Sequence, residues 1–173
     1  MNTFIIMGAP GSGKTPFVRS MIEDKKCLVF DIQNEYGSRV KYEGQTPMNI
    51  PINTRLERSR YVGFDVKEFI NICLTKHETI CVFEEATAFF EGKTGQLTRR
   101  LLINRYHTRN VYLFLFHSIN RVPPGIMEMS NYAVLFKTND ETDTVQRKYS
   151  RLLKYFIDLQ DKPPGEKHII KLL

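Results

Sequence analysis

Short apolar runs alternate with amphipathic stretches along this chain, and the runs are typical of strands. They carry β-branched and aromatic residues and stop at polar ones, as buried strands do. The predicted strands are 3–7, 27–32, 79–83, 111–116, 132–136 and 168–173. Alternation of strands with helices is typical of an α/β fold, in which helices cover both faces of a mainly parallel sheet.

The stretches between these runs predict the helices. Asp65 precedes an apolar stripe and is a suitable N-cap, while Pro123 and Pro124 open a short helix because proline fits the first helical turn. The predicted helices are one through residues 17–22, then 65–76, 98–108, one from 123, and 141–159 as the longest. Residues 38–60 are polar and irregular, which predicts an excursion with room for one short strand.

Length and composition narrow the class of protein. The chain has 173 residues, 42% hydrophobic and 25% charged, enough for one well-buried core, so a single domain over 1–173 is predicted. No apolar run approaches the ~20 residues that cross a bilayer, and the N-terminus lacks the basic leader of a signal peptide. Three cysteines without C-x-x-C spacing, each in or beside an apolar run, predict small buried hydrophobes and a reducing cytoplasm.

A phosphate-binding motif follows the first predicted strand directly. The octet that begins at Gly8 fits G-x-x-x-x-G-K-[ST] in full, between a strand and a helix as the motif requires. Its glycines let backbone N–H groups surround a phosphate chain, at the positive end of the helix dipole. Lys14 is expected to reach the β- and γ-phosphates of ATP, and Thr15 to bind Mg²⁺. The expected nucleotide contacts are Gly8, Ala9, Pro10, Gly11, Ser12, Gly13, Lys14, Thr15 and Pro16.

Two acids follow the strand predicted at 79–83. Such a pair suits a hydrolytic site, with Glu84 holding Mg²⁺ through its water shell and Glu85 polarising the attacking water as general base. Both lie at the carboxyl end of a strand, where open α/β sheets place their ligands. Glu84 stands where aspartate is more usual, and a solvated acidic turn is the alternative interpretation.

A polar residue follows the most hydrophobic predicted strand, 111–116. If that strand is central, His117 lies beside the phosphate loop, where it can bond the γ-phosphate or the attacking water. Ser118 is the second candidate for this role. The alternative is a histidine that caps the strand and bonds nearby backbone.

Together, four segments resemble the HerA/FtsK superfamily of DNA-pumping ATPases. They are the octet, residues 31–36, the strand that ends in Glu84 and Glu85, and residues 105–123. Within it the chain looks most like the small genome-packaging ATPases of membrane-containing and other double-jelly-roll viruses, with the zonula occludens toxin-like assembly ATPases of filamentous phages nearby. The resemblance implies a three-layer P-loop NTPase fold of the RecA/ASCE-like type, with a mainly parallel central sheet flanked by helices.

The same resemblance implies an assembly. Members of the family form a ring, usually a hexamer, around double-stranded DNA, and the ATP sites lie between neighbouring subunits. A viral member would have a capsid or membrane vertex protein as its partner. It would lie in the host cytoplasm or at the virion vertex. The polar strand-end residue, commonly glutamine, is matched by His117. An arginine acts in trans from the segment ahead of it, with Arg109 and then Arg105 as candidates. A solvated helix face or an ordinary ion pair explains either arginine equally well.

Charge points to an anionic partner. The formal net charge is +6 and the pI about 9.2. A translocase grips phosphates without reading sequence, and Lys93, in the glycine-containing segment 92–96, is the first candidate for that contact. A second basic cluster is more typical of a solvated helix face: Arg147, Lys148, Arg151 and Lys154.

These features favour a Mg²⁺-dependent ATPase that moves double-stranded DNA. Within that class they favour a viral packaging motor most. A nucleotide or small-molecule kinase is an alternative, since residues 8–14 resemble the loop of nucleotide monophosphate kinases. The Glu84–Glu85 pair and the lack of an arginine-rich lid argue against it. The other alternative is an ATPase that drives virion assembly or export, although the filamentous-phage relatives usually carry a membrane-spanning segment.

Overall fold

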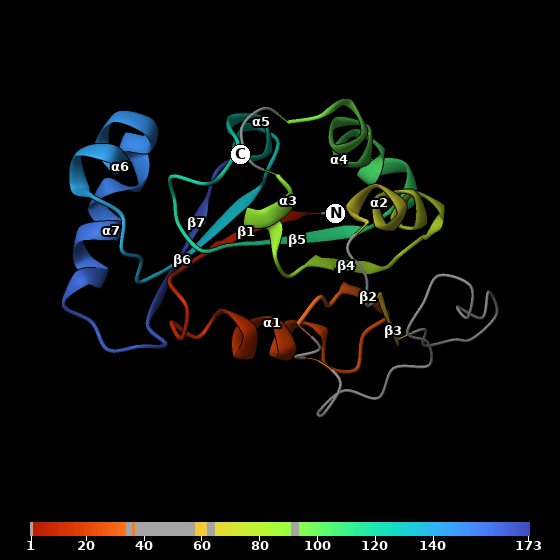
Figure 1. The fold of residues 1–173 in the computed structure, drawn as a ribbon, viewed down its shortest axis with the longest axis horizontal. Coiled ribbons are helices and arrows are strands. Elements are labelled where there is room, and N and C mark those ends of the chain that lie inside the picture. Colours follow the sequence, from red (N-terminus) through yellow and green to blue (C-terminus); the bar gives the residue numbers. More distant parts are fainter. Residues whose placement is uncertain (1, 34–35, 37–57, 62–64, 91–93) are drawn as a thin grey trace.

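The computed structural model describes residues 2–33, 36, 58–61, 65–90 and 94–173. Within these ranges seven strands form one sheet in the order β3-β2-β4-β5-β1-β6-β7 (Figure 1). The strands are β1 Thr3–Met7, β2 Cys27–Phe30, β3 Arg58–Tyr61, β4 Ile80–Phe83, β5 Val111–Phe116, β6 Tyr132–Phe136 and β7 Lys167–Lys171. Neighbouring strands run parallel, except that β7 is antiparallel to β6.

Helices cover the sheet on both faces. They are α1 Lys14–Ile22, α2 Val66–Thr75, α3 Ala86–Phe89, α4 Gln96–Thr108, α5 Pro124–Glu128, α6 Thr142–Tyr149 and α7 Leu153–Gln160. Figure 1 shows α1 on one side of the sheet and α2 to α5 on the other, with α6 and α7 at the end of β6 and β7. The result is the predicted three-layer arrangement with a mainly parallel sheet.

The core explains why the strands are apolar without alternation. Ile5 and Met7 of β1 belong to the larger core cluster, and Ile6 between them belongs to the cluster under α1. All three are fully buried. A strand covered on both faces has no solvent side, so its positions are mainly apolar and do not alternate with polar ones. In the larger core cluster, the rings of Phe83 and Phe114 stack with their centroids 4.6 Å apart.

Most predicted elements are confirmed. Asp65 caps α2, its carboxylate accepting from the backbone N–H groups of Lys67 and Glu68 at 2.9 and 3.0 Å. The short strand expected within 38–60 is β3 at the sheet edge; the rest of that excursion, 38–57, lies outside the described residues. The four-residue helix α3 was not foreseen.

The single long helix predicted over 141–159 is wrong. The chain breaks between α6 and α7 through a 3₁₀ turn, Ser150–Leu152. Tyr149, the last residue of α6, adopts φ −144° and ψ 62°, outside the helical region, and its hydroxyl donates to the carbonyl of Val122 at 2.8 Å. A tertiary anchor of this kind overrides the helical pattern of the local sequence.

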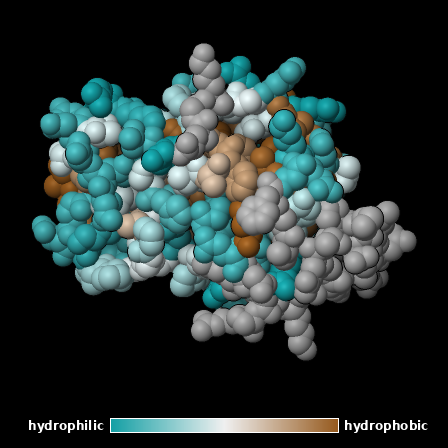
Figure 2. All heavy atoms as spheres, viewed as in Figure 1, coloured by the Kyte–Doolittle hydropathy of each residue, from teal (hydrophilic) through white to brown (hydrophobic). Residues whose placement is uncertain are grey.

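The three cysteines are free and buried, as small hydrophobes. Burial raises the pKa of the Cys73 thiol well above its usual value. Hydrophilic residues cover most of the coloured surface in Figure 2, and the broadest hydrophobic area on this face lies over α3. No described helix combines the length and apolar character that a bilayer crossing requires.

Candidate functional site

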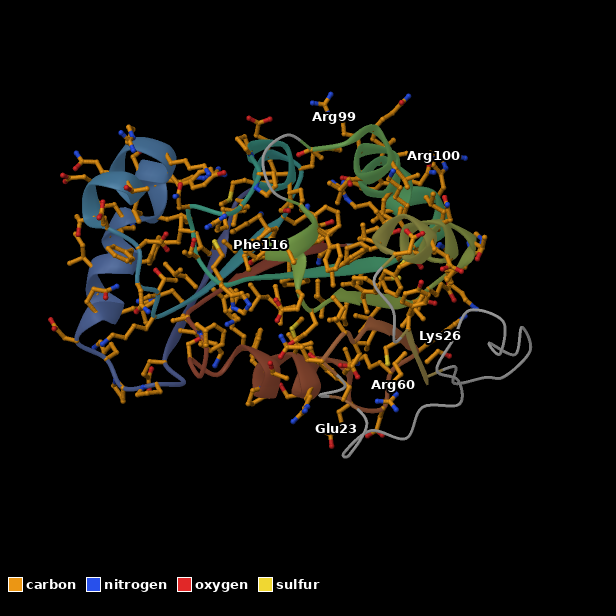
Figure 3. The ribbon with its side chains drawn as sticks, in the orientation of Figure 1. Glu23, Lys26, Arg60, Arg99, Arg100 and Phe116 are labelled. Atoms are coloured by element: carbon orange, nitrogen blue, oxygen red, sulfur yellow. The ribbon has the colours of Figure 1, made fainter. Side chains whose placement is uncertain are left out.

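The phosphate loop is held by both strands beside β1. The N–H of Gly8 donates to the carbonyl of Phe116 at the end of β5, at 3.1 Å, and the N–H of Ala9 donates to the carbonyl of Lys137 just past β6, at 2.9 Å. Phe116 is labelled in Figure 3, at the centre of the molecule. Gly11 and Gly13 have φ of 74° and 104°, the left-handed region that favours glycine. The loop therefore has the rigid base and open backbone that phosphate binding requires.

Lys14 opens α1 and lies inside the loop. Its side chain is buried, and its ammonium donates to the carbonyls of Gly8 at 2.6 Å and Ala9 at 3.0 Å. A buried ammonium is costly unless its N–H groups are bonded, and these carbonyls satisfy that need. The structure therefore places the cation within the phosphate loop, and its contact with the β- and γ-phosphates stays a prediction.

Thr15 and Glu84 meet although they lie far apart in the sequence. The Thr15 hydroxyl donates to Glu84 Oε1 at 2.7 Å, joining the start of α1 to the end of β4. A hydroxyl and a carboxylate are the oxygen donors that Mg²⁺ takes from proteins, alongside waters and phosphate oxygens. The pair fits a magnesium site beside the loop.

Tyr36 completes the support of Glu84. Its hydroxyl donates to Glu84 Oε2 at 2.6 Å, so donors hold both carboxylate oxygens. The backbone N–H of Tyr36 donates to Asp31 Oδ2 at 3.2 Å, and Arg60 of β3 pairs with the same oxygen at 3.4 Å. This chain of contacts links the sheet edge to the metal-side acid. It also gives the longer glutamate a fixed position where aspartate is more usual.

Replacing Tyr36 by phenylalanine is expected to lower the free energy of unfolding by about 1–3 kcal/mol, because it removes a bond to a buried carboxylate and keeps the ring. Hydrolysis should then need more Mg²⁺, since Glu84 is held less firmly. Urea denaturation and a Mg²⁺ titration measure the two effects. Tyr132→Phe is the control: Tyr132 stacks on Phe4 at the start of β6, away from Glu84. Equal behaviour of the two variants would contradict the role of Tyr36.

Glu85 is held between two polar side chains. Gln33, three residues past β2, donates its amide to Glu85 Oε1 at 3.1 Å, and His117 Nε2 lies 2.9 Å from Oε2. The Glu85 side chain is 16% exposed, so a water can still reach it. Bonds on both oxygens fix the direction of the carboxylate, which suits a general base.

His117 comes from the end of the central strand β5, as expected. Its backbone N–H donates to the Thr87 hydroxyl at 2.9 Å, and its ring pairs with Glu85. His117 Nδ1 is buried and has no hydrogen-bond partner among the described residues. The Ser118 hydroxyl accepts from the N–H of Arg121 at 3.3 Å and closes a local turn. Of the two candidates, His117 is therefore the one bonded to the acidic pair.

The arginine candidates lie away from their own phosphate loop. Both precede β5, at the opposite edge of the sheet from the carboxyl ends of the strands. Arg105 is 4% exposed and donates to the carbonyl of Leu102 and the hydroxyl of Tyr106. Arg109 ends α4 and pairs with Glu78 at 3.2 Å, with both side chains about two-thirds exposed. Only Arg109 of the pair is placed to meet another molecule.

The two DNA-contact candidates lie in different segments of the chain. Lys93 lies outside the described residues. The four basic residues of the second cluster, on α6, the 3₁₀ turn and α7, are exposed, as a solvated face would be. Lys148 among them donates to the carbonyl of Asn120, and burial lowers the pKa of its ammonium.

Sequence reasoning missed Gln33 and gave Tyr36 no role. Both follow β2, in the segment 31–36 that carries the resemblance. A run of polar residues directly after a buried strand was the available signal, because parallel strands end at one edge of the sheet. Which acid each residue would meet depended on the strand order.

Comparisons with known proteins address the fold. No protein-family model and no curated protein sequence matches this chain. The genome packaging NTPase B204 of Sulfolobus turreted icosahedral virus 2, in complex with ATP-gammaS, superposes with a TM-score of 0.80 at 14% identity, over 99% of this chain and 92% of that one. B204 of Sulfolobus turreted icosahedral virus, a DNA-packaging ATPase, gives 0.78 at 13% identity with the same coverage.

The N-terminal domain of zonular occludens toxin from Neisseria meningitidis gives a TM-score of 0.53 at 16% identity, over 80% of this chain and 78% of that one. Both groups were expected from the resemblance seen in the sequence. At these identities the likeness establishes the fold. This chain has the P-loop NTPase fold of the viral genome-packaging ATPases over nearly its whole length.

Proposed function

We propose that this chain binds Mg²⁺-ATP at the phosphate loop and hydrolyses it. The observation that carries the proposal is the hydrogen bond from Thr15, which follows Lys14 in the phosphate loop, to Glu84, which precedes Glu85 at the end of β4. Loop N–H groups and Lys14 orient the triphosphate. Thr15 and Glu84 would hold Mg²⁺, which would supply positive charge to the triphosphate.

Glu85 then acts on water. Its carboxylate accepts a proton as the water oxygen attacks the γ-phosphorus, and ADP leaves. Gln33 and His117 keep that carboxylate oriented through their bonds at 3.1 and 2.9 Å. Because His117 continues from β5, which pairs with β1, it also connects the acid to the strand beside the phosphate loop.

In this proposal, ATP hydrolysis drives the movement of double-stranded DNA, in particular into a viral capsid. Support comes from the shared fold with proteins described as genome-packaging NTPases and from the net charge of +6. Arg99 and Arg100 add an exposed positive surface, and Figure 3 shows both pointing away from α4. Backbone phosphates would be gripped without sequence readout.

The proposed active assembly is a ring, usually of six subunits, with Arg109 reaching the site of a neighbour. Exposure of Arg109 and its distance from its own loop support a role in trans. A capsid or membrane vertex protein is the proposed partner, and the host cytoplasm or the virion vertex the proposed location.

The test is ATP hydrolysis measured with and without double-stranded DNA over a range of protein concentrations. We expect DNA to raise the rate and added salt to remove the increase, because phosphate contacts release counterions. Activity per subunit should rise with concentration, since a shared site needs a neighbour. A rate indifferent to DNA would reject the motor and leave the ATPase standing. Phosphoryl transfer to AMP or GMP would instead establish the kinase alternative.

A further inference from the structure

The turn that follows His117, residues 118–122, lies partly in the core. Ile119 and Val122 are fully buried in the larger core cluster, and the N–H of Val122 donates to the carbonyl of Ile119 at 3.2 Å. Buried backbone polar groups need hydrogen-bond partners, and a turn outside the sheet takes them from elsewhere. Side chains from a later part of the chain supply several of them.

Asp140 supplies two of these partners. Its Oδ2 accepts from the N–H of Ile119 at 2.8 Å, and its Oδ1 accepts from the N–H of Asn120 at 3.1 Å. Hydrogen bonds to an ionised carboxylate are stronger than those between neutral groups, and Asp140 is partly buried, which limits competition from water. This carboxylate therefore fixes the backbone two and three residues after His117.

Two side chains of α6 bond the carbonyls of the same turn. Lys148 donates to the carbonyl of Asn120, and the Tyr149 hydroxyl donates to the carbonyl of Val122 at 2.8 Å. Burial raises the pKa of Tyr149 to about 12, so its hydroxyl keeps the proton that it donates. Burial lowers the pKa of Lys148, and the nearby Asp140 carboxylate acts in the opposite direction by favouring the ammonium. The turn is thus held through both its N–H groups and its carbonyls.

The strand order places this contact next to the phosphate loop. β5 and β6 lie on either side of β1, and the loop after β1 donates backbone N–H groups to carbonyls at the ends of both. The turn follows β5, and Asp140 follows β6. Their hydrogen bonds therefore join the two segments that flank the loop.

His117 is also held from the side of the acidic pair. Its backbone N–H donates to the Thr87 hydroxyl at 2.9 Å, and its Nε2 lies 2.9 Å from Glu85 Oε2. Thr87 belongs to α3, and Glu85 is the residue at the N-terminal end of that helix. Only one residue separates His117 from Ile119, so a displaced turn would carry the imidazole away from the carboxylate.

We propose that Asp140 is a positioning residue for ATP hydrolysis, which holds His117 against Glu85 through the backbone of residues 119 and 120. The inference rests on the proposed function in taking Glu85 as the general base. It makes the orientation of that acid depend on α6, because α6 secures the same turn. Loss of the Asp140 bonds should slow hydrolysis and leave ATP binding unchanged, since the expected phosphate contacts come from the loop itself.

Asp140→Asn is the first test, because the amide keeps the shape of the carboxylate and accepts at only one of its two ends. Its kcat for ATP hydrolysis should fall roughly 10–10²-fold, as displacement of a catalytic group does, with KM for ATP unchanged. Tyr149→Phe keeps the buried ring and should show a smaller loss of kcat, because one carbonyl of the turn loses its donor. Asp161→Asn is the matched control, the same change at the exposed end of α7, and should hydrolyse ATP at the wild-type rate.

A double-mutant cycle separates the positioning of His117 from a general effect on folding. If Asp140 acts through His117, then Asp140→Asn should slow hydrolysis no further in a chain that already carries His117→Ala. Urea denaturation shows that each variant is folded under the assay conditions. Additive losses of kcat would overturn the proposal, as would wild-type kcat in both Asp140→Asn and Tyr149→Phe.

A measurement without ATP keeps this inference separate from the proposed function. The nitrogen chemical shift of His117 Nε2 reports its bond to Glu85, and His117→Ala identifies the signal among those of the four histidines. Asp140→Asn should move this signal, and Asp161→Asn should not. An unmoved signal in Asp140→Asn would overturn the positioning role. A moved signal in a protein that hydrolyses no ATP would reject the proposed function and leave the hold of Asp140 on His117 standing.

Discussion

Replacing Glu85 by glutamine is expected to slow ATP hydrolysis by roughly 10²–10⁴-fold and to leave ATP binding intact, because an amide cannot accept the proton of the attacking water. The amide matches the carboxylate in shape and can still bond Gln33 and His117, so the site keeps its form. Single-turnover hydrolysis and equilibrium binding of ATP separate the two effects. Lost binding together with lost turnover would point to a damaged site instead.

A matched substitution serves as the control for Glu85→Gln. Glu23→Gln makes the same chemical change at the exposed end of α1, where Figure 3 shows Glu23 pointing away from the sheet. Turnover should match wild type. If Glu85→Gln also hydrolysed ATP at the wild-type rate, Glu85 would not be the base.

Replacing Gly8 by alanine is expected to disrupt the phosphate loop. The added Cβ would lie 2.4 Å from the Ser12 hydroxyl oxygen and 2.8 Å from the Cβ of Phe136, which is buried and cannot retreat. Overpacking of this kind costs about 1–3 kcal/mol of unfolding free energy. Displacement of Ser12 should also weaken binding of both ATP and tripolyphosphate, measured by titration alongside urea denaturation.

Gly95→Ala is the control for the same change of residue. Gly95 precedes α4 at φ −66°, and a Cβ there meets no heavy atom within 4 Å. Its stability and nucleotide affinity should remain close to wild type. Wild-type affinity in Gly8→Ala would mean that the loop can shift without loss of nucleotide binding, which would contradict the close fit of Gly8 against Ser12 and Phe136.

The sequence predicted those parts of the site whose residues are adjacent in the chain. The phosphate loop is eight consecutive residues, and Glu84 and Glu85 stand directly after an apolar run. Tyr36 and Gln33 were not assigned because their partners are set by strand order. Only the placement of β2 beside β4 brings them to the two acids.

The arginines and the C-terminal helices show a second limit. Arg105 is buried with Leu101 and Thr108, at the spacing of one helical face, and that periodicity was available in the sequence. The break after Tyr149 could not be predicted from the local sequence, because the partner of the Tyr149 hydroxyl is the carbonyl of Val122, in a different part of the chain. Local pattern identifies elements; long-range contacts decide where they stop.

The position of β1 between β5 and β6 has a consequence for how this protein is made. Both of its sheet neighbours, β5 and β6, come from the second half of the chain, and the carbonyl of Ser12 receives its bond from Gly165. During synthesis, β1 therefore has neither sheet neighbour until residues 111–136 have been made. The phosphate loop therefore reaches its full set of supporting contacts only after residue 165 has been synthesised, so nucleotide binding is expected to follow that point.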